Sequence, residues 1–190
     1  IGPNGELIWE RTFYDNGYNW ANDIVIADIN NIIISGYTSN KLMGKEEQSS
    51  AFLMKVSSVG EVIWQREFGN DKHRISRSIS VFDNGGFIVT GSIRSTEDAD
   101  DSDCWIAELD RSGIIVWENY FGGSGEDIGH DISPIKGGGF IITGMTKSIA
   151  QNMSDLWLIK TDDKGQEQWT RTYHESGYHW GNSVYSLENG

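Results

Sequence analysis

Short apolar runs separated by glycine-rich turns recur along this chain, and their pattern predicts strands rather than helices. Between the runs at 77–82 and 86–91, residues 83–86 read Asp-Asn-Gly-Gly, and a third run follows at 104–109. An Asn-Gly pair supplies the positive φ angles of a tight hairpin, and β-branched and aromatic residues favour strands. The pattern therefore predicts antiparallel hairpins joined by short turns.

The hydrophobic pattern also repeats. A glycine followed four residues later by a tryptophan occurs four times, and the tryptophans are spaced by 55, 53 and 52 residues. A second motif, an apolar run closed by Ser-Gly or Thr-Gly, ends at Gly36, Gly91 and Gly144 and keeps the same step. Two independent motifs in one register indicate a repeat architecture. The repeated tryptophans are Trp9, Trp64, Trp117 and Trp169. We expect the second aromatic residue of each repeat to be a core residue as well, namely Phe52, Trp105 and Trp157.

Each period contains four strand-like runs, which predict an all-β fold built as a β-propeller of four-stranded antiparallel blades. We expect the whole chain, 1–190, to form one propeller segment with about three full blades and two partial ones. A ring needs more blades than this, so we expect a longer chain or completion by another molecule. The full blades are 23–68, 77–121 and 129–173, with 1–14 as the closing strand of a preceding blade and 182–190 as the first strand of a following one.

The repeat resembles a known family. Its pattern of Asp-x-x-Gly-x-x-x-Trp-x-x-x-Phe, a loop and then Asp-Asn-Gly-Gly-Phe-Ile-x-Thr-Gly resembles the β-propeller repeats of bacterial and archaeal secreted and cell-surface proteins. The Gly-to-Trp step is also similar to the tryptophan-docking motif of quinoprotein-type propellers. The resemblance implies the fold and an extracellular or cell-surface location, with the periplasm as an alternative. Because Asp110 and Asp162 stand three residues before their glycines rather than four, it implies no quinone site.

Composition narrows the classes of partner. The formal net charge is −13 and the isoelectric point is near 4.6. Nucleic-acid backbones and anionic membranes attract clustered Lys and Arg, so neither nucleic acid nor membrane insertion is expected. Cys104 is the only cysteine, which excludes an intrachain disulfide and a cysteine-based zinc site.

Strand direction predicts where a binding site lies. Successive antiparallel strands place two short, nearly invariant turns of each blade on one rim and two long, variable connections on the other. Binding residues tend to gather on such loops of a rigid scaffold. On this variable rim we expect aromatic contacts to a protein or glycan ligand, and the alternative is that these rings tuck under the next blade. The candidate residues are Tyr18, Trp20, Tyr178 and Trp180.

An acidic loop between the second and third strands of the middle blade is the candidate metal site. Carboxylate oxygens are the ligands that Ca²⁺ prefers, although the spacing is not that of an EF-hand loop. The alternative is a solvated acidic loop without a metal. The candidate calcium ligands are Asp98, Asp100, Asp101 and Asp103.

No catalytic motif stands out. The chain has no Gly-x-Ser-x-Gly elbow and no His-Glu-x-x-His sequence. We therefore expect a non-enzymatic binding or scaffolding module whose partner is a protein, a glycan, or further copies or segments of the same protein. The alternative is a fragment of a propeller enzyme, a glycan hydrolase or a quinoprotein, with part of its catalytic residues outside this chain.

Overall fold

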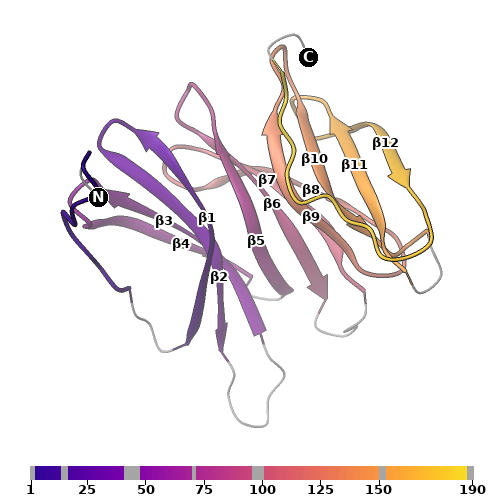
Figure 1. The fold of residues 1–190 in the computed structure, drawn as a ribbon, viewed down its shortest axis with the longest axis horizontal. Helices are drawn as coiled ribbons and strands as arrows, with labels where there is room; N and C mark the ends of the chain where they lie inside the picture. Colours follow the sequence, from indigo (N-terminus) through magenta and orange to yellow (C-terminus); the bar gives the residue numbers. More distant parts are fainter. Residues whose placement is uncertain are drawn as a thin grey trace.

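Three antiparallel sheets of four strands each form the protein (Figure 1). The computed structural model describes residues 3–13, 17–40, 48–69, 72–95, 101–149 and 153–187. Within these ranges the twelve strands are the only regular elements, so no described segment is a helix that could cross a membrane. The all-β class and the four-stranded antiparallel unit predicted from the sequence are confirmed.

The strands follow one another within each sheet in chain order, so every sheet is a simple meander. Sheet 1 contains β1 (Tyr18–Asp28), β2 (Asn31–Asn40), β3 (Gln48–Ser57) and β4 (Val62–Phe68). Sheet 2 contains β5 (Lys72–Val81), β6 (Phe87–Ser95), β7 (Asp103–Leu109) and β8 (Ile115–Phe121). Sheet 3 contains β9 (Asp127–Pro134), β10 (Phe140–Thr146), β11 (Asp155–Thr161) and β12 (Glu167–Tyr173).

The first strand of each sheet begins earlier than the sequence pattern suggests. The pattern places the start of the second repeat at residue 77, whereas β5 begins at Lys72, and β1 begins at Tyr18 rather than residue 23. The reason is backbone pairing, since the residues before the apolar run continue the ladder with the second strand. Tyr18 and Trp20 therefore lie in a strand rather than in a loop.

The turn between the third and fourth strands explains the repeated Asp-x-x-Gly. At the β11–β12 turn, Asp162 Oδ1 accepts hydrogen bonds from the backbone N–H groups of Lys164 (2.9 Å) and Gln166 (2.8 Å). Gly165 has a φ of 71°, a left-handed conformation that favours glycine. Asp110 and Gly113 form the same arrangement between β7 and β8.

The repeated tryptophan of each repeat packs against the turn glycine of the next repeat. A Cβ atom built on Gly60 would lie 3.0 Å from the Trp9 ring, and one on Gly113 would lie 2.9 Å from the Trp64 ring. At Gly165 the distance to the Trp117 ring would be only 2.3 Å. The six-membered part of each ring therefore packs against the turn of the next sheet, and this contact recurs three times along the described chain.

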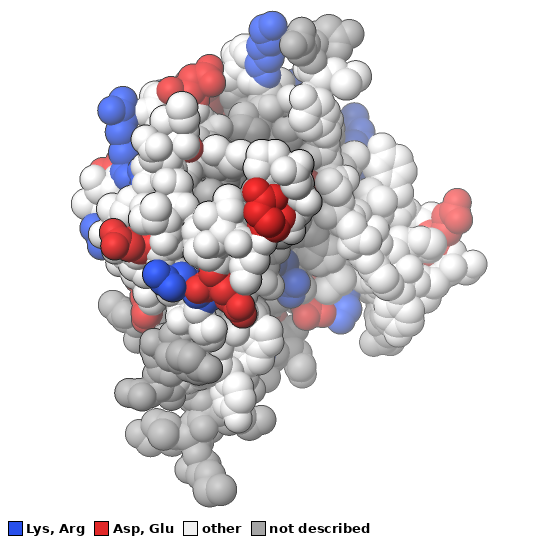
Figure 2. Space-filling model, turned by 60° about the vertical axis from the view of Figure 1, so that its left-hand side comes forward, with Lys and Arg blue, Asp and Glu red and all other residues white. Residues whose placement is uncertain are grey.

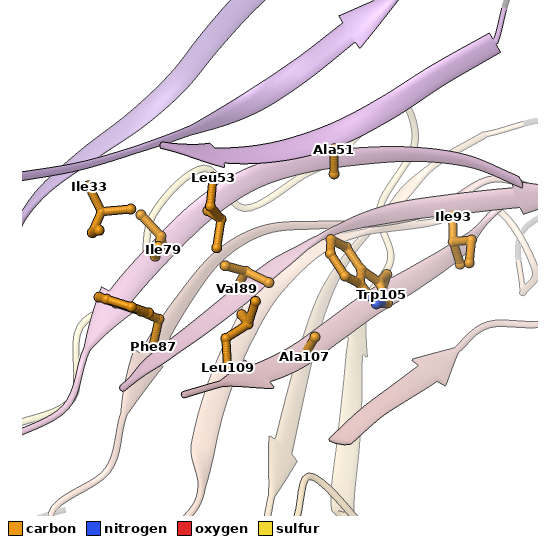
Figure 3. Close-up of a cluster of buried hydrophobic side chains, with 10 residues drawn as sticks. All are labelled: Ile33, Ala51, Leu53, Ile79, Phe87, Val89, Ile93, Trp105, Ala107 and Leu109. Atoms are coloured by element: carbon orange, nitrogen blue, oxygen red, sulfur yellow. The ribbon is translucent and has the colours of Figure 1, made fainter. Parts of the chain in front are cut away.

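The core lies between neighbouring sheets rather than inside any one of them. Between sheets 1 and 2, Leu53 of β3 points toward Val89 of β6, and Trp105 of β7 belongs to the same cluster (Figure 3). A second cluster between sheets 2 and 3 includes Cys104 and Trp157. The prediction that Trp105, Trp157 and their counterpart Phe52 are core residues is confirmed, because all three are buried.

Polar bonds also join the first strands of successive sheets. Asp23 Oδ2 of β1 accepts from the backbone N–H of Ile79 in β5 at 2.9 Å. Ser78 Oγ of β5 donates to Asp131 Oδ1 of β9 at 2.7 Å. The other oxygen of Asp131 accepts from the backbone N–H of Val184 at 2.8 Å, which holds the last described segment against sheet 3.

Candidate functional site

The variable rim is defined here as the edge at which β1, β5 and β9 begin. Because neighbouring strands are antiparallel, this edge also carries the ends of β2, β6 and β10. The side chains predicted to bind ligand fall here, on β1 and on the segment that follows β12. The variable rim therefore carries the candidate binding residues.

Three aromatic rings form a stack on the rim of sheet 1. Tyr18 and Trp20 of β1 are 60 % and 41 % exposed, and their ring centroids are 5.8 Å apart with planes inclined by 27°. Tyr37 of β2 is directly opposite Trp20 in the ladder, and their rings stack at 4.8 Å and 11°. These rings form a flat, partly exposed apolar surface, which we call the aromatic platform (Tyr18, Trp20, Tyr37).

A β-bulge follows the aromatic platform, and the repeated glycine of the second strand makes room for it. The ladder between β1 and β2 shifts between Ala21 and Asp23, where a Cβ atom on Gly36 would lie 1.9 Å from the carbonyl oxygen of Trp20. Gly91 and Gly144 have the same role in sheets 2 and 3. The bulge leaves one residue of the first strand out of the ladder.

The three bulge residues are polar and differ from one another: Asn22, Arg77 and His130. Two of them bond to the backbone of the next repeat. Asn22 Nδ2 donates to the carbonyl of Ser76 at 2.7 Å, and His130 Nδ1 donates to the carbonyl of Gly181 at 2.9 Å. Arg77 makes no such bond, and its buried Nε has no partner among the described residues.

Burial lowers the pKa values of two of the bulge residues. The pKa of the Arg77 guanidinium is lowered mainly by burial, while Glu126 and Tyr37 act in the opposite direction. The pKa of His130 is also lowered, first by burial and then by Arg77, against the hydrogen bond to Gly181 and the charge of Glu126. Arg77, His130 and Glu126 therefore lie close enough to interact electrostatically at the start of β5 and β9.

The second aromatic pair lies three repeats further along the chain. Tyr178 is 63 % exposed and Trp180 is 50 % exposed. Trp180 lines an open cavity of about 560 Å³ together with His174 and His179. His174 Nδ1 is 2.5 Å from Asp155 Oδ1. All four predicted aromatic contacts are thus exposed on the rim, although only the first pair belongs to a stack among the described rings.

The predicted calcium site falls only partly on described residues. Asp98 and Asp100 lie outside the described residues. Asp101 Oδ1 accepts a 3.3 Å bond from the backbone N–H of Gly125, and the pKa of Asp103 is raised mainly by burial and further by Asp101 and Asp127. Within the described residues, no group of three or more His, Cys, Asp or Glu is arranged to hold a metal. The calcium assignment stays a prediction.

Sequence reasoning missed Tyr37 and the three bulge residues. A signal for the bulge residues exists, because Asn22, Arg77 and His130 all stand fourteen residues before the repeated glycine. In the aligned repeats this position changes from an amide to a guanidinium to an imidazole, while the isoleucine two residues later is kept. Tyr37 could be found only from the register that places it opposite Trp20.

No family model matches this chain, and no curated protein shows significant similarity to it.

Proposed function

We propose that this protein is a non-enzymatic binding module of an extracellular or cell-surface protein, and that its ligand binds on the variable rim. The observation that carries this proposal is the aromatic platform. Soluble proteins rarely leave several large rings stacked and exposed without a partner. Flat aromatic faces beside polar groups suit the apolar face of a sugar ring, and a glycan is therefore the ligand we favour over a protein.

We also propose that the three sheets are consecutive blades of a β-propeller. The support is the recurrence of one contact, in which the tryptophan of each repeat packs on the turn glycine of the next. The first strands β1, β5 and β9 lie next to one another, as the inner strands of successive blades do (Figure 1). A rigid radial scaffold of this kind would hold the rim groups in fixed positions.

The polar side chains at and near the bulges are relevant to the alternative that this protein is part of a propeller enzyme. Catalytic propellers gather unlike polar side chains near their inner strands, and Arg77, His130 and Glu126 have that character. Glycoside hydrolysis, however, uses two carboxylic groups on either side of the bond that is cleaved. Glu126 is paired with Lys147 Nζ at 2.5 Å. This arrangement favours binding over hydrolysis.

Affinity electrophoresis in gels that contain a soluble polysaccharide tests the proposal. We expect Trp20→Ala to weaken retardation by roughly tenfold or more, since the loss of a stacked ring removes about 1–3 kcal/mol. The matched control is Trp169→Ala. Trp169 is 36 % exposed, close to the 41 % of Trp20, but it lies on the last strand of sheet 3. Equal retardation of Trp20→Ala and the unmodified protein on every polysaccharide tried would contradict the proposal.

A further inference from the structure

The Arg77 guanidinium is one of the groups on the rim whose hydrogen bonding is incomplete among the described residues. Arg77 is half-buried, and its Nε is inaccessible to water yet has no hydrogen-bond partner among the described residues. The equivalent side chains Asn22 and His130 are both bonded to a backbone carbonyl of the next repeat. Arg77 is thus the bulge residue that does not serve as a tie between sheets.

The nearby acidic side chain is already engaged. Glu126 forms an ion pair with Lys147. No carboxylate of the described residues lies within ion-pair distance of Arg77. Arg74, in the same strand, also has a buried Nε without a partner, but its Nη1 is 3.1 Å from Glu118 Oε2. A partly buried cation without a partner is costly because burial removes its water without replacing it. An external anion cannot reach the buried Nε, but it would supply a partner for the two Nη nitrogens, which are not among the buried unpartnered atoms.

Arg77 lies close to the strand that carries the aromatic platform. The hydrogen bond from Asn22, two residues after Trp20 in β1, to the carbonyl of Ser76 joins this strand to the residue just before Arg77. Tyr37 stacks on Trp20 at 4.8 Å and also interacts electrostatically with Arg77. Because β1 and β2 both contact β5, the rings and the guanidinium lie on neighbouring strands.

We propose that this surface binds an acidic glycan, with a sugar ring on the aromatic platform and a uronate carboxylate on Arg77. The guanidinium presents a planar fork of donors that matches a carboxylate, and such charge-assisted bonds are stronger than neutral ones. This inference rests on the proposed binding function and specifies the chemistry of its ligand. It assigns Arg77 as the residue that selects acidic over neutral sugars.

The overall negative charge of the protein means that any preference for acidic sugars must come from contacts close to Arg77. The net charge of −13 repels a polyanion at long range. On the face shown in Figure 2, Lys and Arg side chains alternate with Asp and Glu, and neither sign forms a continuous patch. Binding of an acidic glycan must therefore come from contacts at short range, and removal of one guanidinium should have a large effect.

The test compares polygalacturonate with its methyl ester, which has the same backbone but lacks the carboxylate charge, by affinity electrophoresis. We expect the unmodified protein to bind polygalacturonate more tightly than the ester. Arg77→Gln should weaken binding of polygalacturonate roughly tenfold or more and leave binding of the ester unchanged. The matched control is Arg111→Gln, which removes the same charge from a turn on the opposite rim, where Arg111 Nε donates to Asn84 O.

Each outcome separates this inference from the proposed function. Equal binding of the two polysaccharides, no binding of polygalacturonate, or equal effects of Arg77→Gln and Arg111→Gln would overturn the acidic-glycan assignment. If Trp20→Ala still weakened binding of the ester in that case, the binding function would stand without it. Thermal unfolding of Arg77→Gln checks the fold, and a variant that unfolds early is replaced by Arg77→Lys, which keeps the charge and should lose only the forked geometry.

Discussion

At the scale of single residues, Cys104 shows how packing between sheets changes side-chain chemistry. Its thiol is fully buried between sheets 2 and 3 and lies 3.8 Å from Thr90 Oγ1. Burial is the main reason that its pKa is raised to about 12, and the nearby charges of Asp127 and Asp103 raise it further. The thiolate that reacts with alkylating and oxidising reagents is therefore suppressed in the folded protein.

This shift predicts a loss of stability at alkaline pH. An unfolded thiol releases its proton near pH 8.5, whereas the folded thiol keeps it up to about pH 12. The contribution is thus complete below about pH 8.5 and is lost as the pH rises, at up to about 1.4 kcal/mol per pH unit. Urea unfolding between pH 7 and 10 measures it. Cys104→Ala should show a shallower decline, and identical slopes would contradict the prediction.

Core residues could be predicted from the sequence because the repeat pattern determines them, whereas the residues at the bulges could not. Trp105 and Trp157 were predicted as core residues because one large apolar residue per repeat at a fixed place has to be buried. Arg77 was not predicted as a site residue, because its direction depends on a bulge that removes it from the ladder. The same side chain one residue along the strand would point to the other face of the sheet.

At the scale of elements, the hairpin turns were the most predictable parts of the fold. Their geometry depends on local chemistry, an Asp that accepts backbone hydrogen bonds and a Gly with a positive φ. The starts of the first strands were less predictable, because Tyr18–Asp28 and Lys72–Val81 are extended by pairing with a strand that lies further along the chain. The position of the aromatic platform on a strand follows from that pairing.

The turns offer a graded test of hydrogen-bond energy. Asp162→Ala removes the Oδ1 atom that accepts hydrogen bonds from Lys164 N and Gln166 N, and should lower the free energy of unfolding by about 1–2 kcal/mol. Ser57 takes the same place in sheet 1, where its Oγ accepts a single bond from Glu61 N at 3.1 Å. Ser57→Ala should therefore lower the free energy of unfolding by about half as much as Asp162→Ala. Chemical denaturation measures both, and a larger loss for Ser57→Ala would refute this account of the turns.

At the scale of the whole molecule, stability comes from contacts between sheets. Trp117 packs on the turn of sheet 3, donates from Nε1 to Glu108 Oε2 at 2.8 Å, and lies 6.0 Å from the ring of Phe140. The last tryptophan of the series, Trp169, packs on no described glycine, and Arg171 covers its ring at 5.8 Å. The repeat period predicted that these tryptophans are equivalent, but their environments depend on which sheet follows.

This difference predicts unequal effects of the same substitution. Trp117→Ala should lower the free energy of unfolding by about 3–5 kcal/mol, as other large-to-small changes in packed interfaces do. Trp169→Ala should cost less than about 1 kcal/mol, because its ring is 36 % exposed and leaves no cavity between sheets. Urea unfolding of the two variants measures the contrast. Equal losses would mean that sheet-to-sheet docking is not the main source of stability, since Trp169 would then contribute as much without a docking partner as Trp117 does with one.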